Sequence, residues 1–265
     1  MGPPPIVPRD RADIWPAAGE DLCYLAGDWR ILQRVLGHRW SLDDLVTAWF
    51  AAELVETCPP RRLLDLGCGI GAVLLLLAWR FPDTRCVGIE AQGPSVDLAR
   101  RSAAWNGIER RVEVRLGDLR DPGAAPDGAI YELITGTPPY LPRGSATEPT
   151  RSQQAPCHLE HRGGIEEYCV TAARLLAPGG RFVLCHAAPQ TARVESAASA
   201  AGLAIECRRE VVPRQGKAPL FSVFSLRPGG EPGQLTVPPP LVVRDEGGQR
   251  TPEFRAVRQR MGMPP

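Results

Sequence analysis

The sequence has almost no lysine: Lys217 is the only one among 31 basic residues, and all the others are arginines. The chain also contains 28 prolines and many alanines, so the arginine count reflects the general composition and by itself predicts no binding face. Because the formal net charge is only +1, the overall electrostatic field does not favour nucleic acid. Any contact with RNA or DNA must therefore come from local residues.

Paired cysteines are absent too. No C-x-x-C motif occurs, and several of the eight cysteines lie in apolar segments, which indicates small core residues in a reducing compartment. Cys157, His158 and His161 lie close together in the chain, but no second ligand pair follows at the spacing of a zinc site. We interpret this cluster as an ordinary loop and expect no metal.

Long hydrophobic runs are missing as well. The longest, from Ala72 to Trp79, is too short to cross a bilayer. Residues 1–13 carry acidic side chains and lack the apolar core of a secretory signal. We therefore expect a cytoplasmic protein without a membrane partner. The sequence predicts no particular oligomeric state.

A chain of 265 residues that is 43% hydrophobic can form one large α/β domain. Short apolar runs, expected as strands, lie at residues 62–66, 86–89, 112–116, 131–135, 181–185, 204–212 and 220–226. Helical patterns separate them at residues 72–80, 95–105, 165–176 and 190–201. Because residues 213–219 leave no room for a crossover helix, the last two strands should pair antiparallel. The sequence predicts a Rossmann-like sheet of seven strands, six parallel and one antiparallel, with helices on both faces.

The ends of the chain differ from this pattern. Residues 1–20 are rich in proline and charge and are expected to be flexible. The α/β domain is expected over residues 21–227, and the part from Asp21 to Glu56 is interpreted as helical, with Ser41 as an N-cap. Residues 228–265 are expected to form an appended extension with a strand-like stretch at 241–243 and a helix that begins at Thr251-Pro252-Glu253.

A glycine-rich turn follows the first strand of the alternating region. Gly67, Gly69 and Gly71 let the main chain turn sharply and approach a ligand that a Cβ atom would block. With Ala72 the run also fits G-x-G-x-x-A, so a dinucleotide fold is permitted. Asp65 favours S-adenosylmethionine instead, because a carboxylate suits the methionyl ammonium group and would repel a pyrophosphate.

Acidic residues end the next two strands. Glu90 follows the second strand, where a carboxylate can accept hydrogen bonds from both hydroxyls of a ribose. Asp118, with Leu119 beside it, follows the third strand, where an adenine amino group would lie. Since the carboxyl ends of parallel strands meet at one edge, these residues are expected to share a crevice with the glycine turn.

The fourth strand ends in the run Thr137-Pro138-Pro139-Tyr140. Two consecutive prolines cannot continue a sheet ladder, so the chain leaves the strand in a rigid turn. Such a turn can hold acceptors, the Thr137 hydroxyl and the Pro138 carbonyl, against the hydrogens of a planar amine, while the Tyr140 ring stacks on the base. These four residues are the expected catalytic residues.

The same run resembles the N/D/S-P-P-Y/F/W motif of methyltransferases that act on amino groups of adenine, cytosine or glutamine. From Gly37 to Leu226 the chain is most similar to the bacterial tRNA(Val) adenine-37 N6-methyltransferase family, through the segments GHRWSLDDLVTAWFA, LLDLGCGIGAVLLLLA, VGIEAQGPSVDLARRSAAWNGI, VEVRLGDLRD, TPPYLPRG and EHRGGIEEYCVTAARLLAPGGRFVL. The resemblance implies a class I methyltransferase fold and a set of residues that bind S-adenosylmethionine: Asp43, Asp65, Gly67, Cys68, Gly69, Gly71, Glu90, Asp118 and Leu119.

One position departs from the family pattern. Thr137 stands where the family has asparagine. A threonine hydroxyl can accept a hydrogen bond, but it reaches less far than an amide and can also donate. Because serine occupies this place in some cytosine-N4 enzymes, the departure is compatible with amine methylation and leaves the choice of base open.

Three functions remain open on the sequence. The first is methylation of adenine N6 in RNA, with tRNA favoured, where phosphate contacts would come from Arg143, Arg151, Arg162, Arg208, Arg209, Arg214 or Lys217. The second is methylation of a protein glutamine or a small-molecule amine; the glutamine enzymes usually bring a larger N-terminal domain. The third is a non-catalytic scaffold or activator, against which the intact glycine turn and Pro-Pro-Tyr run argue.

Overall fold

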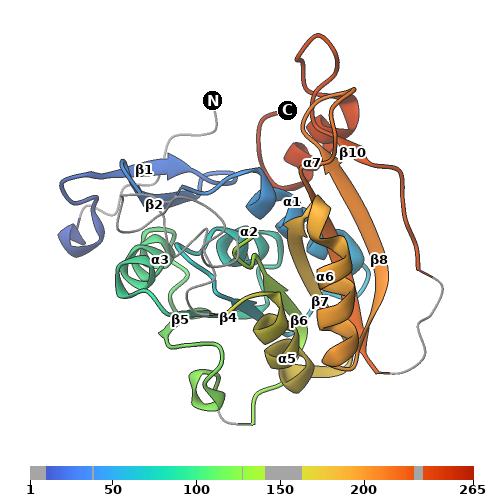
Figure 1. Ribbon diagram of the computed structural model, residues 1–265. Coiled ribbons are helices and arrows are strands. Elements are labelled where there is room, and N and C mark those ends of the chain that lie inside the picture. Colours follow the sequence, from blue (N-terminus) through green and yellow to red (C-terminus); the bar gives the residue numbers. More distant parts are fainter. Residues whose placement is uncertain (1–9, 38, 127, 141–162, 230–234) are drawn as a thin grey trace.

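The computed structural model describes residues 10–37, 39–126, 128–140, 163–229 and 235–265. An eight-stranded sheet lies at its centre, in the order β10-β8-β9-β7-β6-β3-β4-β5 (Figure 1). The strands are β3 (Arg62–Leu66), β4 (Arg85–Glu90), β5 (Val112–Leu116), β6 (Tyr131–Gly136), β7 (Leu176–Ala187), β8 (Leu203–Val212), β9 (Phe221–Pro228) and β10 (Leu241–Val242). Only β9 pairs antiparallel, with β7 and β8. Strands β3 to β9 therefore have the predicted six-plus-one arrangement, and the predicted fold class is confirmed.

Helices cover both faces of the sheet. The helices α1 (Leu42–Leu54), α2 (Ala72–Arg80) and α3 (Gly93–Trp105) pack in one hydrophobic layer, and α5 (Ile165–Leu175) and α6 (Thr191–Ala200) pack in the other. Successive strand residues alternate between the layers, as Leu63 and Leu64 do in β3. This alternation explains why the strands read as continuous apolar runs in the sequence.

The segment before α1 corrects the helical interpretation of residues 21–34. It forms an antiparallel hairpin of β1 (Glu20–Tyr24) and β2 (Arg30–Arg34). Side chains of α3 bond the outer edge of β2: Asn106 Oδ1 accepts from the Arg30 N–H at 2.9 Å, and Ser102 Oγ accepts from the Leu32 N–H at 2.9 Å. Because these partners come from a distant helix, the local pattern did not reveal the strand. Only α1, which Ser41 and Asp44 begin with a capping box, is helical as predicted.

Residues 1–20 were predicted to be flexible, and the structure describes this segment from residue 10 on. Residues 1–9 lie outside the described residues. Beyond them, Ala12–Ile14 form a 3₁₀ turn, and Ile14 is buried with 3% of its surface exposed. The Trp15 ring lies 5.9 Å from the ring of Trp105 in α3. These apolar contacts attach the segment to the domain.

The C-terminal extension packs against the same domain. β10 pairs parallel with the end of β8, and α7 (Pro252–Arg260) begins at the predicted N-cap, where Thr251 Oγ1 accepts from the Phe254 N–H. After α7, the Gly262 carbonyl accepts hydrogen bonds from the Tyr24 hydroxyl at 2.5 Å and the Gly27 N–H at 2.8 Å. The chain end is thereby joined to the hairpin. None of the helices in the described part of the chain has the length and apolar character to cross a membrane.

Gly262 offers a test of this attachment. Its φ is +71°, and a Cβ atom there would lie 2.5 Å from two ring carbons of Trp79. We expect Gly262→Ala to lower the free energy of unfolding by about 2–4 kcal/mol in denaturant titrations, through overpacking and an unfavourable φ. Gly216→Ala is the matched control, since its φ is +77° but its Cβ would meet open space. The control should lose only about 1–2 kcal/mol; equal losses would contradict the packing argument.

Candidate active site

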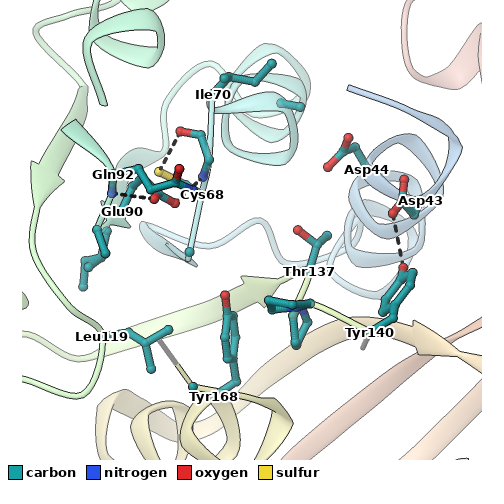
Figure 2. A pocket seen from close by; sticks show the side chains of 18 of the residues that line it. Asp43, Asp44, Cys68, Ile70, Glu90, Gln92, Leu119, Thr137, Tyr140 and Tyr168 are labelled. Carbon is teal, nitrogen blue, oxygen red and sulfur yellow. Dashed lines mark hydrogen bonds between the residues drawn. The ribbon is translucent and has the colours of Figure 1, made fainter. Parts of the chain in front are cut away.

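A cavity of about 510 Å³ opens at the carboxyl edge of the sheet, over the ends of β3, β4, β5 and β6. α1 and the N-terminal part of α5 contribute to its walls (Figure 2). Its lining includes eleven of the thirteen residues expected from the sequence: Asp43, Gly67, Cys68, Gly69, Glu90, Asp118, Leu119, Thr137, Pro138, Pro139 and Tyr140. The fold therefore brings the expected cofactor residues and the expected catalytic turn into one cavity.

The glycine turn and Glu90 form one side of the cavity. Gly67 and Gly69 have φ values of +60° and +54°, which favour glycine, and a Cβ atom on Gly69 would meet open space. The Glu90 carboxylate accepts from the Gly69 N–H at 2.9 Å and from the Gln92 N–H at 2.7 Å. It thus ties the end of β4 to the turn after β3, at the place where a ribose would need its acceptor.

Asp118 is already engaged in a local ion pair. Arg120 donates to both of its carboxylate oxygens, from Nε at 2.9 Å and from Nη2 at 2.6 Å. The Asp118 side chain is still 30% exposed, so a carboxylate oxygen can accept a further hydrogen bond from a ligand. The charge that a ligand meets at this end of the cavity is partly neutralised by Arg120.

Two expected residues do not line the cavity. Asp65 is only 2% exposed, and its Oδ1 accepts from the Thr135 hydroxyl at 2.8 Å. Burial raises the pKa of Asp65 to about 7, against the opposing effect of that hydrogen bond. Gly71 is the N-cap of α2 with φ +87°, and a Cβ there would approach the Ala99 Cβ to 3.2 Å. Both residues shape the turn from behind the cavity wall.

Acidic side chains instead reach the cavity from the beginning of α1. Asp43 and Asp44 both line it, and Figure 2 shows them on the side opposite Glu90. Asp44 completes the capping box, with its Oδ2 2.9 Å from the Ser41 N–H. Burial, reinforced by the charge of Asp43, raises the pKa of Asp44 well above its ordinary value. Asp65, at the motif position, was the more obvious candidate from the sequence, but Asp43 on α1 is the more accessible acid, since Asp44 is buried.

Tyr140 connects the catalytic turn to α1. Its hydroxyl lies 3.2 Å from Asp43 Oδ2 and 3.0 Å from Cys185 Sγ, and its ring centroid is 5.4 Å from that of His186 (Figure 2). Burial, more than these two neighbours, raises the pKa of Tyr140 well above its usual range. In this structure the tyrosine thus packs in the wall of the cavity, between the turn and the roof helix, while Thr137 lies between Tyr140 and Tyr168.

Tyr168 is a site residue that the sequence did not single out. It stands on α5, lines the cavity and is 5% exposed. A Cβ atom on Gly67 would lie 2.0 Å from its hydroxyl oxygen, and one on Gly136 would lie 2.8 Å from its ring. Glycines at the ends of two neighbouring strands were the available signal, because they leave room for a large side chain from outside the sheet.

The segment between β2 and α1 supplies another lining residue that was missed, Arg39. It is the only arginine or lysine among the described lining residues, and its Nη1 lies 3.0 Å from Asp21 Oδ2. That ion pair raises the pKa of Arg39.

The expected loop cluster of Cys157, His158 and His161 lies outside the described residues, as do Arg143, Arg151 and Arg162. Among the candidate RNA contacts that are described, Arg208 and Arg209 form ion pairs with Glu195 and Glu253.

The sheet order and the glycine turn after β3 are those of the class I methyltransferase fold. Residues 63–137 match the family model described as "Methyltransferase domain". The crystal structure of a predicted O-methyltransferase from Agrobacterium tumefaciens superimposes with a TM-score of 0.61 at 20% identity, over 84% of this chain and 98% of that one. This likeness establishes the fold.

Two curated relatives match part of the chain. A tRNA1(Val) (adenine(37)-N6)-methyltransferase of Porphyromonas gingivalis is 30% identical over 55% of this chain and 57% of its own length. A release factor glutamine methyltransferase of Rhodospirillum rubrum is 34% identical over 56% of this chain and 51% of its own length. The chain thus spans little more than half the length of these relatives.

The buried Asp65 generates a test by pH. Its pKa is raised on folding, so the folded state holds the proton more tightly and wild-type stability falls as the pH rises from about 4 to about 7. We expect Asp65→Asn to be more favourable, relative to wild type, at about pH 8 than at about pH 5 in thermal or urea unfolding. Asp83→Asn, an exposed carboxylate in a turn, is the control for removing a charge. A difference from wild type that is the same at both pH values would contradict the assignment.

Proposed function

We propose that this protein transfers a methyl group from S-adenosylmethionine to the exocyclic amino nitrogen of adenine, N6, in tRNA. The observation that carries the proposal is the shared cavity: the Thr137–Tyr140 turn at the end of β6 faces the same space as the glycine turn of β3 and Glu90 of β4. A donor bound on the strand ends would lie directly beside an acceptor held by the turn.

The chemistry of the cavity fits the donor. Its volume lies within the range of small-molecule sites, and S-adenosylmethionine, when bound, supplies an electrophilic methyl group. Glu90 would hold the ribose hydroxyls and Asp118 the adenine amino group. Asp43 would take the methionyl ammonium group, since Asp65 and Asp44 are buried. Arg39 would face the methionyl carboxylate at the cavity wall.

The acceptor amine would be oriented by the turn. The Thr137 hydroxyl and the Pro138 carbonyl can each accept a hydrogen bond from one amino hydrogen, which directs the nitrogen lone pair toward the donor. A strong general base is not required, because the nitrogen becomes acidic once it carries the methyl group. Tyr140 would stack on the base only after leaving its contacts with Asp43 and Cys185; in its present position it fixes the turn.

The relatives support an acceptor of this type, and they also support a second candidate. A glutamine side chain presents a planar amide nitrogen of similar shape, and the Rhodospirillum relative is named for that reaction. We favour RNA because a tRNA adenine-N6 enzyme is also among the relatives and because the cationic surface described below suits phosphates. The protein's compartment, expected to be the cytoplasm, is consistent with either substrate.

The substrate class can be tested directly. The protein is incubated with labelled S-adenosylmethionine and separate pools of tRNA, ribosomal RNA, protein and metabolites, and nucleosides are analysed by mass spectrometry. We expect label in tRNA as N6-methyladenosine. Label in protein, on glutamine, would replace the first candidate with the second. If no pool is labelled and calorimetry detects no donor binding, the domain is a scaffold rather than an enzyme.

Thr137 gives a test of the catalytic turn. Thr137→Val keeps the shape of the side chain and removes the hydroxyl, so we expect kcat to fall by about tenfold or more while the Kd for S-adenosylmethionine stays within about twofold. Thr137→Asn restores an acceptor with a longer reach and is expected to retain or raise transfer to adenine. A valine variant with wild-type kcat would show that the hydroxyl does not hold the amine.

A further inference from the structure

Five arginines gather on the C-terminal extension and the β8–β9 turn, and each guanidinium is held by an oxygen of the chain itself. We refer to Arg214, Arg244, Arg250, Arg255 and Arg258 as the C-terminal arginine surface. Arg214 donates to the Glu246 carbonyl at 2.7 Å and Arg244 to the Gly248 carbonyl at 2.7 Å. The other three donate to oxygens of Pro265, Arg250 and Pro264 in that order, at 2.9, 2.6 and 2.8 Å.

Arg214, Arg244, Arg255 and Arg258 bond main-chain carbonyl oxygens, which carry no net charge, whereas the Pro265 oxygen that holds Arg250 belongs to the carboxylate of the last residue. Within the described part of the chain, none of the five forms an ion pair with a side-chain carboxylate, whereas the neighbouring Arg209 and Arg260 pair with Glu253 and Glu53. The two acids on the same turn are engaged otherwise: Asp245 accepts from the Gln249 N–H, and Glu246 lies 3.4 Å from the Gln215 amide nitrogen. Among the described residues, these guanidinium groups are thus oriented by the chain and make no side-chain ion pair.

The arrangement places like charges against each other. Arg244 and Arg250 are directly opposed across an antiparallel bridge, a position in which equal charges destabilise the pair. The pKa of Arg258 is lowered, first by burial and then by the charge of Arg250. Apolar side chains beneath the surface, including Phe254, Val257 and Met261, are buried and hold it in place. A bound anion would remove the repulsion.

The surface lies on the same edge of the sheet as the cavity. β10 runs parallel to β8, and the turns that carry Arg214 and Arg244 follow the carboxyl ends of these two strands. In the sheet order β10 is four positions from β6, or about 19 Å at the usual strand spacing. In Figure 1 this C-terminal segment stands at the end of the sheet away from β5. A metabolite in the cavity cannot reach so far, but a macromolecule can.

We propose that the C-terminal arginine surface binds the phosphate backbone of the RNA whose base enters the cavity. This inference rests on the proposed function. Guanidinium groups present a planar fork that matches phosphate oxygens, and pre-oriented ones lose little entropy on binding. Repeated phosphates along one strand match a row of fixed cations, whereas a release-factor peptide would have no recurrent anion at this distance.

The test measures RNA binding apart from catalysis. Fluorescently labelled tRNA is titrated with Arg244→Glu/Arg250→Glu and with a control, Arg85→Glu/Arg110→Glu. The control makes the same change of charge at two exposed positions on the opposite edge of the sheet, the first residue of β4 and the turn before β5. Between about 50 and 200 mM salt, we expect the first variant to bind at least about tenfold more weakly. Its slope of log K against log salt should be smaller by about 2, while the control stays near wild type.

Donor binding and kinetics complete the design. In calorimetry the Kd for S-adenosylmethionine should be unchanged in the charge-reversal variant, and KM for tRNA should rise more than kcat falls. Arg255→Ala, a milder change on the exposed face of α7, serves if the double variant does not fold; it should weaken tRNA binding about two- to threefold and lower the salt slope by about 1.

The outcomes separate the surface from the function. If wild-type protein methylates tRNA and the cluster variants bind and methylate it as wild type does, the arginine surface is wrong and the proposed function stands. If wild-type protein does not bind tRNA and methylates only protein or small amines, the proposed tRNA substrate and the proposed role of the arginine surface are both wrong. An equal loss of tRNA affinity in the control variant would show a general effect of charge. It would also contradict the proposed binding of RNA by the C-terminal arginine surface.

Discussion

Parallel pairing of β3 with β4 on one side and with β6 on the other determines where every part of the site lies. The register places Leu66 beside both Ile89 and Gly136, so the glycine turn, Glu90 and Thr137 leave the sheet at nearly the same level. Glu90 then ties two of these ends together through the Gly69 N–H. Without this common level the donor side and the acceptor turn could not share a cavity.

Helix α1 and α5 complete the cavity from outside the sheet. α1 brings Asp43 and Asp44 to the cavity, and the Tyr140–Asp43 contact connects this helix to the catalytic turn. From the other layer, α5 inserts Tyr168 into the space left by Gly67 and Gly136. The Tyr140–Asp43 contact therefore joins a residue of the acceptor turn to one on the cofactor side of the cavity.

Most of the fold could be predicted because its strands and helices carry their own periodicity. β3 and β5 have the predicted bounds, and the strands and helices from α2 to β9 were all anticipated, with β7 beginning five residues before the predicted start. The hairpin of β1 and β2 was missed because its outer hydrogen-bond partners, Ser102 and Asn106, lie about 70 residues away in α3. The local sequence pattern does not indicate a hydrogen-bond partner that is so distant in the chain.

The sequence by itself determined the order of strands and helices, the glycine turn and the chemical identity of the acids and the Thr-Pro-Pro-Tyr run, since these follow from local steric and hydrogen-bonding rules. Tertiary structure decided which of them face the cavity. It buried Asp65 against Thr135, placed Asp43 and Arg39 in the cavity wall, and added Tyr168. Which side of a turn reaches solvent depends on what packs behind it, and that packing joins residues far apart in the chain.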